Sequence, residues 1–183
     1  METSPETYWE VYSFLMREAE VLDERHEREW LEMVTDDVEY LMPVRVNRER
    51  GEGDGFSEEA FYFEETRGSL ELRIRRLETE YAWAEDPPSR TRHFVTNIRV
   101  AEGEEEDEVA VKSNLLLYRS QGSDPSYDLL SAERQDVLRR EEGQWKLRRR
   151  VILVRGASRP FWGAVGGMRM PCATLSERMP WKR

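Results

Sequence analysis

The chain has 183 residues, with 38 Asp and Glu against 28 Lys and Arg, and a single Cys. This length suits one domain whose core needs no disulfide, and the net charge of −10 argues against nucleic-acid binding. No apolar run reaches the ~18 residues of a membrane span and the polar N-terminus lacks a signal-peptide pattern, so we expect a cytoplasmic protein that binds neither nucleic acid nor membrane.

Amphipathic helices are predicted in the first third of the chain. Ser4-Pro5 is typical of a helix start, and apolar residues then recur every three or four positions over 8–22. A short second helix is predicted around Trp30. Asp36-Asp37 is expected to end it in a turn, because Asp readily bonds its own backbone there. A strand is predicted over 38–46.

The remainder of the chain adds one helix and then changes to the period of β-strands. Ser69 is expected to cap the helix. Strands are predicted over 93–100, 109–118, 126–140 and 144–154, and the gaps between them are short enough for hairpins. Helices followed by such a meander indicate an α+β domain, with helices packed on one face of an antiparallel sheet.

Three consecutive arginines, Arg148-Arg149-Arg150, lie in the last predicted strand. Strand alternation predicts that Arg149 shares a face with Leu147, while its two neighbours point the other way. An arginine that points into the core needs a carboxylate partner. Glu133 and Asp136 on the preceding strand are the candidates.

The supply of metal ligands is small. A Rieske cluster needs two Cys and two His, and a mononuclear non-haem iron site needs two His and a carboxylate. The chain offers only Cys172, His26 and His93, and His26 lies in a run of charged residues typical of an exposed helix face. We therefore expect no metal or cofactor site in this chain.

Seven fragments, in order, resemble the beta (small) subunit of bacterial aromatic-ring-hydroxylating dioxygenases, which are Rieske non-haem iron oxygenases. They include the helical residues 14–23, the strand fragments 114–119 and 130–134, and residues 145–153. The most specific is Tyr-Ala-Trp-Ala-Glu-Asp-Pro-Pro-Ser-Arg-Thr-Arg-His over 81–93.

This resemblance implies an NTF2-like cone, with N-terminal helices on a strongly curved, mixed and mainly antiparallel sheet. It also implies a structural beta subunit of an α3β3 hexamer, whose partners are alpha subunits and other beta subunits. In that complex the alpha subunit holds the Rieske [2Fe-2S] cluster and the mononuclear iron. It also performs the NAD(P)H-dependent cis-dihydroxylation of an aromatic ring.

The segment around the Pro87-Pro88 turn is the candidate subunit interface. Arg90 and Arg92 follow this rigid turn, and their planar guanidinium groups suit bidentate pairing with carboxylates across a subunit boundary. We expect Trp83 and His93 to belong to the same interface.

The alternative is a stand-alone NTF2-like isomerase, dehydratase or cyclase. Such an enzyme would use His93 and Asp37, with Tyr40 as a proton donor. The competing interpretation of the histidine is a hydrogen-bonded anchor, kept neutral by the two cations Arg90 and Arg92 beside it.

The resemblance stops near Val154. Residues 155–183 contain six Arg or Lys and one Glu, lack strand alternation, and read like an unrelated sequence. We therefore divide the chain into an NTF2-like domain over 1–154 and an atypical basic tail over 155–183. Disorder and contact with an acidic surface are two interpretations of this tail, and a reading-frame change is one hypothesis for its origin.

Overall fold

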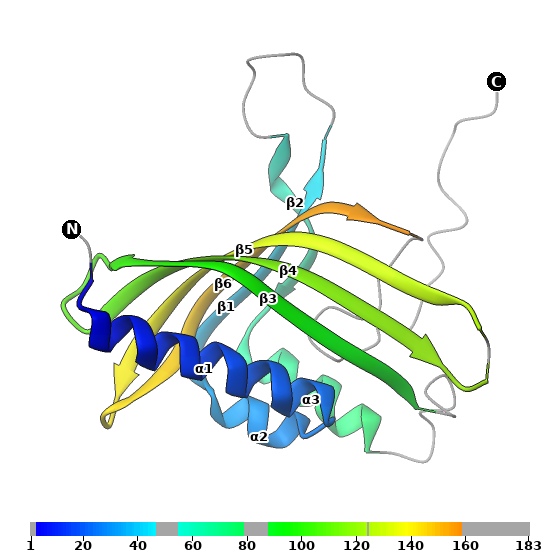
Figure 1. Cartoon of the computed structure of the whole chain (residues 1–183), viewed down its shortest axis with the longest axis horizontal. Helices are drawn as coiled ribbons and strands as arrows, with labels where there is room; N and C mark the ends of the chain where they lie inside the picture. The colour runs from blue at the N-terminus through cyan, green and yellow to red at the C-terminus, as the bar shows by residue number, and fades with distance from the viewer. Residues whose placement is uncertain (1–2, 47–54, 79–87, 124, 159–183) are drawn as a thin grey trace.

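A six-stranded sheet curls around the N-terminal helices in the computed structural model, which describes residues 3–46, 55–78, 88–123 and 125–158 (Figure 1). In chain order the elements are α1 (Pro5–Asp23), α2 (Glu27–Glu32), β1 (Val34–Arg45), β2 (Phe56–Glu65), α3 (Arg67–Leu77), β3 (Ser89–Glu102), β4 (Glu108–Gln121), β5 (Tyr127–Glu141) and β6 (Gln144–Ala157).

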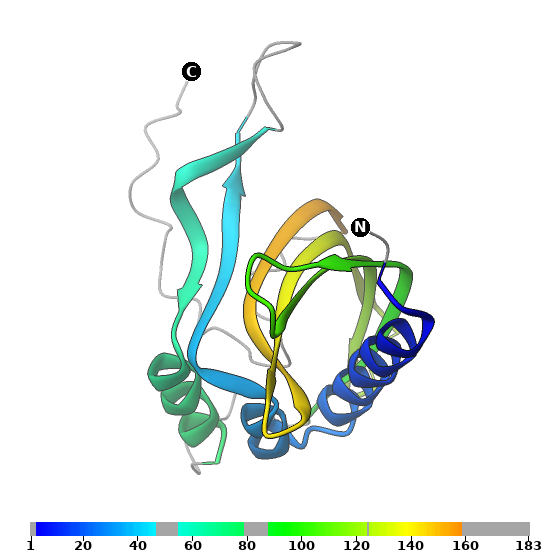
Figure 2. The same cartoon turned by 90° about the vertical axis from the view of Figure 1, so that its left-hand side faces the viewer.

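The strand order is β2-β1-β6-β5-β4-β3. The pairs β3–β4, β4–β5, β5–β6 and β1–β2 are antiparallel, whereas β1 pairs with β6 in parallel. This confirms the predicted α+β class with a mixed, mainly antiparallel sheet. Figure 2 shows how strongly the sheet curves, with α1 lying along the open side of the curve.

Helix α1 begins where the sequence predicts. The Ser4 hydroxyl accepts a hydrogen bond from the Thr7 backbone N–H at 3.1 Å, as expected of an N-cap. The predicted apolar stripe is only partly right, because Tyr12 is exposed and the charged Glu18 is buried. None of the described helices is long and apolar enough to cross a membrane.

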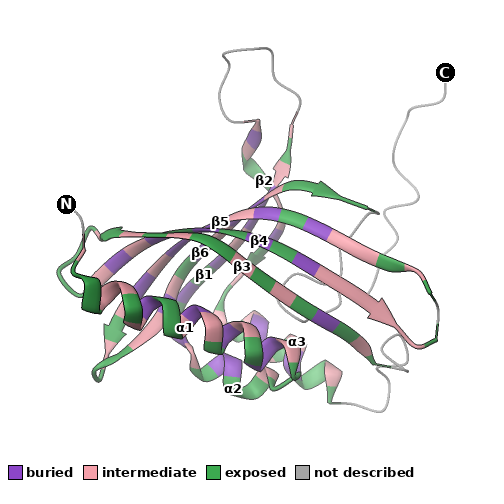
Figure 3. Cartoon of the chain, viewed as in Figure 1, coloured by how far each residue is buried: buried purple, intermediate pink, exposed green. Residues whose placement is uncertain are grey.

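Alternating burial along the strands separates an inner from an outer face of the sheet (Figure 3). In β4 the odd-numbered residues 109–117 are buried, and Leu116 between them is exposed. The inner faces of the strands pack with α1, α2 and α3 to form the hydrophobic core. Its largest fully buried apolar members are Leu15, Trp30, Met42, Ile74, Leu117, Leu130, Leu138, Leu147 and Ile152.

Two local predictions are wrong, and one strand was missed. Asp36 and Asp37 do not form a turn, because β1 begins at Val34 and includes them. The cap of α3 is Thr66, and Ser69 completes a capping box by accepting a hydrogen bond from the Thr66 N–H at 2.9 Å. The edge strand β2 was not predicted at all, since its acidic residues hide the alternation.

The predicted domain boundary at 154 falls inside β6, which continues to Ala157. Arg155 pairs with Glu133 at 3.2 Å, and the Ser158 N–H donates to the Leu129 carbonyl at 2.9 Å. The rest of the basic tail and Trp83 lie outside the described residues.

Candidate functional site

A bulge in β6 decides which arginine enters the interior. Val137 of β5 pairs with Arg149, but the next residue, Leu138, pairs with Leu147, so Arg148 is the extra residue on β6. Beyond the bulge the alternation is reversed. Arg150, rather than the predicted Arg149, therefore shares the inner face with Leu147 and is fully buried.

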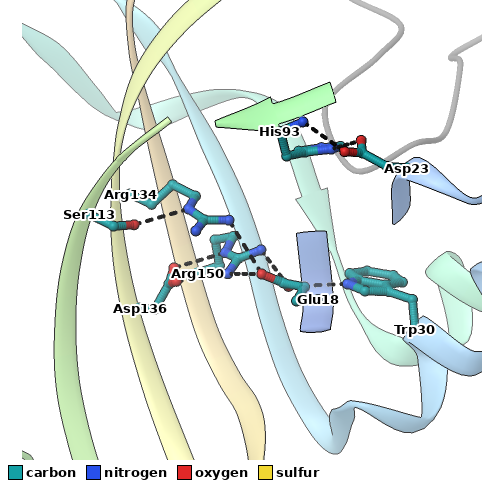
Figure 4. A network of polar contacts seen from close by, with 8 residues as sticks. All are labelled: Glu18, Asp23, Trp30, His93, Ser113, Arg134, Asp136 and Arg150. Atoms are coloured by element: carbon teal, nitrogen blue, oxygen red, sulfur yellow. Dashed lines mark hydrogen bonds and ion pairs between the residues drawn. The ribbon is translucent and has the colours of Figure 1, made fainter. Parts of the chain in front are cut away.

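Arg150 lies between two buried carboxylates (Figure 4). Its guanidinium donates to Glu18 of α1 at 2.7 and 2.9 Å and to Asp136 of β5 at 2.8 and 2.7 Å. The prediction that Asp136 pairs with an inward arginine is confirmed, whereas Glu133 lies on the outer face and pairs with Arg155. Glu18 is the partner that the sequence interpretation missed.

Further contacts around Glu18 complete this network. Arg134 of β5 donates to Glu18 at 3.3 Å and to the Ser113 hydroxyl at 3.2 Å. The Trp30 indole N–H of α2 donates to Glu18 at 3.2 Å. We call Glu18, Asp136, Arg134 and Arg150 the buried charge cluster. It contains two anions and two cations from α1, β5 and β6, so its formal charge is zero.

The buried charge cluster keeps Glu18 ionised. Burial by itself would raise the pKa of Glu18, but the charges of Arg150 and Arg134 outweigh this and lower it to about 2. Burial also opposes the charge of Arg150, yet Asp136 and Glu18 raise the pKa of its guanidinium well above its ordinary value. Glu18 therefore cannot donate a proton near neutral pH, and its observed contacts fasten α1 to the sheet and to α2.

Tyr40 of β1 belongs to the packing around this cluster. Its ring meets Trp30 edge-on, with centroids 6.0 Å apart, and the Arg150 guanidinium lies 5.8 Å from the ring centroid. Burial raises the pKa of the Tyr40 hydroxyl above its ordinary value. The side chain supports the cluster and is a poor proton donor.

A second buried pair joins the end of α1 to β3. The Asp23 carboxylate accepts a hydrogen bond from His93 Nδ1 at 2.6 Å and another from the His93 backbone N–H at 3.1 Å. A carboxylate can only accept, so Nδ1 carries the proton. His93 Nε2 is buried and has no hydrogen-bond partner among the residues that the structure describes.

The three residues of the alternative catalytic site do not meet. Asp37 lies on the outer face, where it pairs with Arg139 at 3.0 Å and with Arg148 at 2.8 Å. Burial opposes its charge, but hydrogen bonds from Thr35 and Arg139 and the nearby charges of Arg139 and Arg148 together lower the pKa of the Asp37 carboxyl. His93 and Tyr40 face inward, so the carboxylate that orients the histidine is Asp23 and not Asp37.

The predicted interface residues are divided between the two faces of β3. Arg90 and Arg92 are exposed on the outer face, where Arg90 donates to the Gly122 carbonyl at 2.6 Å. His93 points inward and contacts Asp23. A carboxylate, and not the two arginines, is therefore the charged group that touches the imidazole.

In the part of the chain that the structure describes, neither histidine belongs to a metal-binding cluster. His26 is half exposed at the start of α2, near Glu24 and Glu29, and His93 is bound to Asp23 inside the cone. Within the described residues, no three His, Cys, Asp or Glu side chains gather as metal ligands would.

A signal for the missed residues is present in the sequence. Glu18 stands between Leu15 and Leu22 at spacings of three and four, so an acidic residue occupies the apolar stripe of α1. Such a residue is buried only when it is paired. Asp23 gives no comparable signal, because its partner His93 is 70 residues away in the chain.

The chain is similar to known proteins over most of its length. The family described as "Ring hydroxylating beta subunit" matches residues 17–158. The 3-phenylpropionate/cinnamic acid dioxygenase subunit beta of Photorhabdus laumondii is 43% identical over 120 residues, which cover 64% of this chain and 67% of the relative. The biphenyl 2,3-dioxygenase subunit beta of Rhodococcus jostii is 31% identical over 155 residues, which cover 82% of each chain.

The fold is also shared with solved structures. A chain of naphthalene 1,2-dioxygenase with indole bound in its active site aligns with a TM-score of 0.75. The alignment covers 84% of this chain and 81% of the other, with 24% identity. This likeness confirms the expected NTF2-like fold class.

Replacing Glu18, the acidic residue that α1 contributes, tests the buried charge cluster. We expect Glu18→Leu to lower the free energy of unfolding by about 3–5 kcal/mol, because Arg150 and Arg134 lose a buried counter-charge. Glu20→Leu on the exposed face of α1, where Glu20 pairs with Arg17, should cost no more than about 1 kcal/mol. Urea unfolding followed by circular dichroism measures both, and equal losses would contradict the assignment.

The pH dependence of stability provides a second test. The pKa of Glu18 is depressed to about 2, so its contribution is complete above the unfolded value near 4.5 and is lost as the pH falls toward 2. This contribution is on the order of 3 kcal/mol. Glu18→Gln should therefore show a shallower loss of unfolding free energy between pH 4.5 and 2 than the unmodified chain. Parallel curves would refute the ionised state of Glu18.

Proposed function

Because the chain belongs to the family of ring hydroxylating beta subunits, we propose that it serves as the structural, non-catalytic subunit of a multicomponent aromatic-ring dioxygenase. Beta subunits of this family associate with alpha subunits, and the complex is an oxidoreductase. We further propose an α3β3 hexamer, in which three copies of this chain support three alpha subunits.

The buried charge cluster is the observation that favours a structural role. Every carboxylate of the cluster accepts hydrogen bonds from a guanidinium, and every member is nearly or fully buried. Such groups hold their neighbours in place. A catalytic carboxyl would instead need a raised pKa and a free lone pair directed at a substrate.

We place the oxygen chemistry on the alpha subunit. With one Cys and two His, the chain has too few ligands for a Rieske [2Fe-2S] cluster together with a mononuclear iron site. Electrons from NAD(P)H would reach the alpha subunit through a reductase and a ferredoxin. The reaction would add both atoms of O₂ to an aromatic ring and give a cis-dihydrodiol.

Co-expression with an alpha subunit tests this proposal. We expect equimolar co-purification, iron in the complex, and no stoichiometric iron or ring oxidation in the chain purified alone. Iron analysis and product chromatography measure these outcomes. Stoichiometric iron or dihydrodiol formation by the isolated chain would overturn the proposal.

The outer-face arginines provide an assembly test. Arg92→Ala should reduce the hexamer fraction measured by size-exclusion chromatography with light scattering, because Arg92 is exposed and has no ion-pair partner among the described residues. Arg75→Ala on α3, where Arg75 pairs with Glu71 of the same helix, is the matched control. Unchanged hexamer content in Arg92→Ala would argue against an interface role.

A second candidate function is favoured by the free Nε2 of His93. With Nδ1 bound to Asp23, Nε2 keeps the lone pair that accepts a proton, as a general base would in an elimination or isomerisation. Asp23 thus replaces Asp37 in the stand-alone enzyme considered from the sequence.

One assay separates the two candidates. A cis-dihydrodiol can lose water to form a phenol, and the absorbance of the phenol reports the loss of water. The structural role predicts that the isolated chain does not accelerate the reaction. Acceleration that is abolished in His93→Ala and retained in Asp37→Asn would establish the second candidate.

A further inference from the structure

Charge is segregated along the β3–β4 hairpin. Residues 89–101 and 109–121 contain five Arg or Lys and no Asp or Glu, although the chain as a whole is strongly acidic. The turn between them, 102–108, contains five Glu and one Asp. In Figure 1 this turn and the opposite end of the hairpin lie at opposite ends of the sheet.

The end of the hairpin away from the turn presents an exposed apolar surface. Phe94 and Leu116 are direct cross-strand partners on the outer face, and they are 53% and 43% exposed. Beside them Tyr127, which is 54% exposed, stacks on Tyr118 with ring centroids 5.6 Å apart. Arg92 lies opposite Tyr118 on the neighbouring strand. We call these five residues the outer patch.

The composition of the outer patch is that of an interface. Exposed aromatic and aliphatic side chains that lie together, with an arginine beside them, are typical of protein-binding surfaces. Arg99, further along the outer face of β3, stands directly opposite Lys112. Two like charges at directly opposed positions destabilise a sheet. An acidic partner would relieve this repulsion.

The backbone of the acidic turn is held by hydrogen bonds, while four of its side chains are exposed. Its backbone is fixed by hydrogen bonds from the Gly103 N–H to the Glu108 carbonyl at 3.1 Å and from the Arg140 N–H to the Asp107 carbonyl at 2.8 Å. Four of its acidic side chains are exposed and form no ion pair within the described part of the chain: Glu104, Glu105, Glu106 and Asp107.

One copy cannot bring its own turn onto its own patch. The hairpin is paired from Ser89 and Gln121 at one end to Glu102 and Val109 at the other. At about 3.3 Å per residue, this places the turn roughly 30 Å from the outer patch. Contact between them therefore requires two copies of the chain.

We infer that the acidic turn of one copy docks on the outer patch of a second copy, and that this head-to-tail contact builds the ring of beta subunits. The inference rests on the proposed function. A head-to-tail contact can build an open filament or a closed ring, and the proposed α3β3 hexamer requires the closed ring of three. A two-fold contact of patch against patch would instead bring like charges together, which disfavours association.

Charge reversal in the full chain, with and without the co-expressed alpha subunit, tests the inference. We expect the patch variant Arg90→Glu/Arg92→Glu, at the end of the hairpin that carries the outer patch, and the turn variant Glu105→Arg/Glu106→Arg each to weaken self-association at least about tenfold, as measured by light scattering over a dilution series. Combining all four substitutions in one chain should restore the oligomer, because every interface then again joins opposite charges. Arg28→Glu/Arg75→Glu on α2 and α3 is the charge-matched control.

The outcomes separate this inference from the proposed function. If the patch and turn variants associate normally, or if the combined variant stays monomeric although its circular dichroism is native, the head-to-tail contact is wrong. Loss of alpha-subunit binding while beta oligomers persist would assign the surface to the alpha subunit and also overturn the inference. If the chain forms rings by this contact but never binds an alpha subunit, the inference stands and the proposed function fails.

Discussion

The position of α1 depends on one buried carboxylate. Glu18 lies in the apolar stripe of the helix and can leave water only because Arg150 and Arg134 neutralise it inside the cone. A hydrophobic cluster of similar volume could match such a network in stability, so what the charges add is specificity of placement. Sliding or rotating α1 by one position would separate Glu18 from both guanidinium groups, which fixes the helix against β5 and β6.

The same network explains why a cone-shaped fold serves here as a building block. Within the cone the carboxylates of Glu18 and Asp136 accept hydrogen bonds from guanidinium groups, and the Asp23–His93 pair fixes the end of α1 to β3. A catalytic carboxylate acts on a substrate, whereas these two hold arginines in place. In this chain the cone interior mainly fixes the shape of the sheet, and the shape of the sheet in turn determines what its outer face can offer to other subunits.

The two faces of β3 therefore have separate tasks. Its inward residues contact α1, and its outward residues carry exposed arginines and an apolar surface that no described part of the chain covers. The packed interior keeps the β3–β4 hairpin rigid. A rigid hairpin holds its acidic turn far from the arginines at its other end. Charges arranged in this way favour association in a single relative orientation.

The sequence by itself determined the start of α1, the antiparallel hairpins of the second half, the shortage of metal ligands and the family, since all of these are local patterns or counts. Tertiary structure alone decided the parallel β1–β6 pairing and the bulge at Arg148, which turned Arg150 inward instead of Arg149. It also paired His93 with Asp23 and placed Asp37 on the outer face. Strand alternation predicts which residues share a face only while the register is unbroken. Neither a register shift nor a partner 70 residues away leaves a mark in the local sequence.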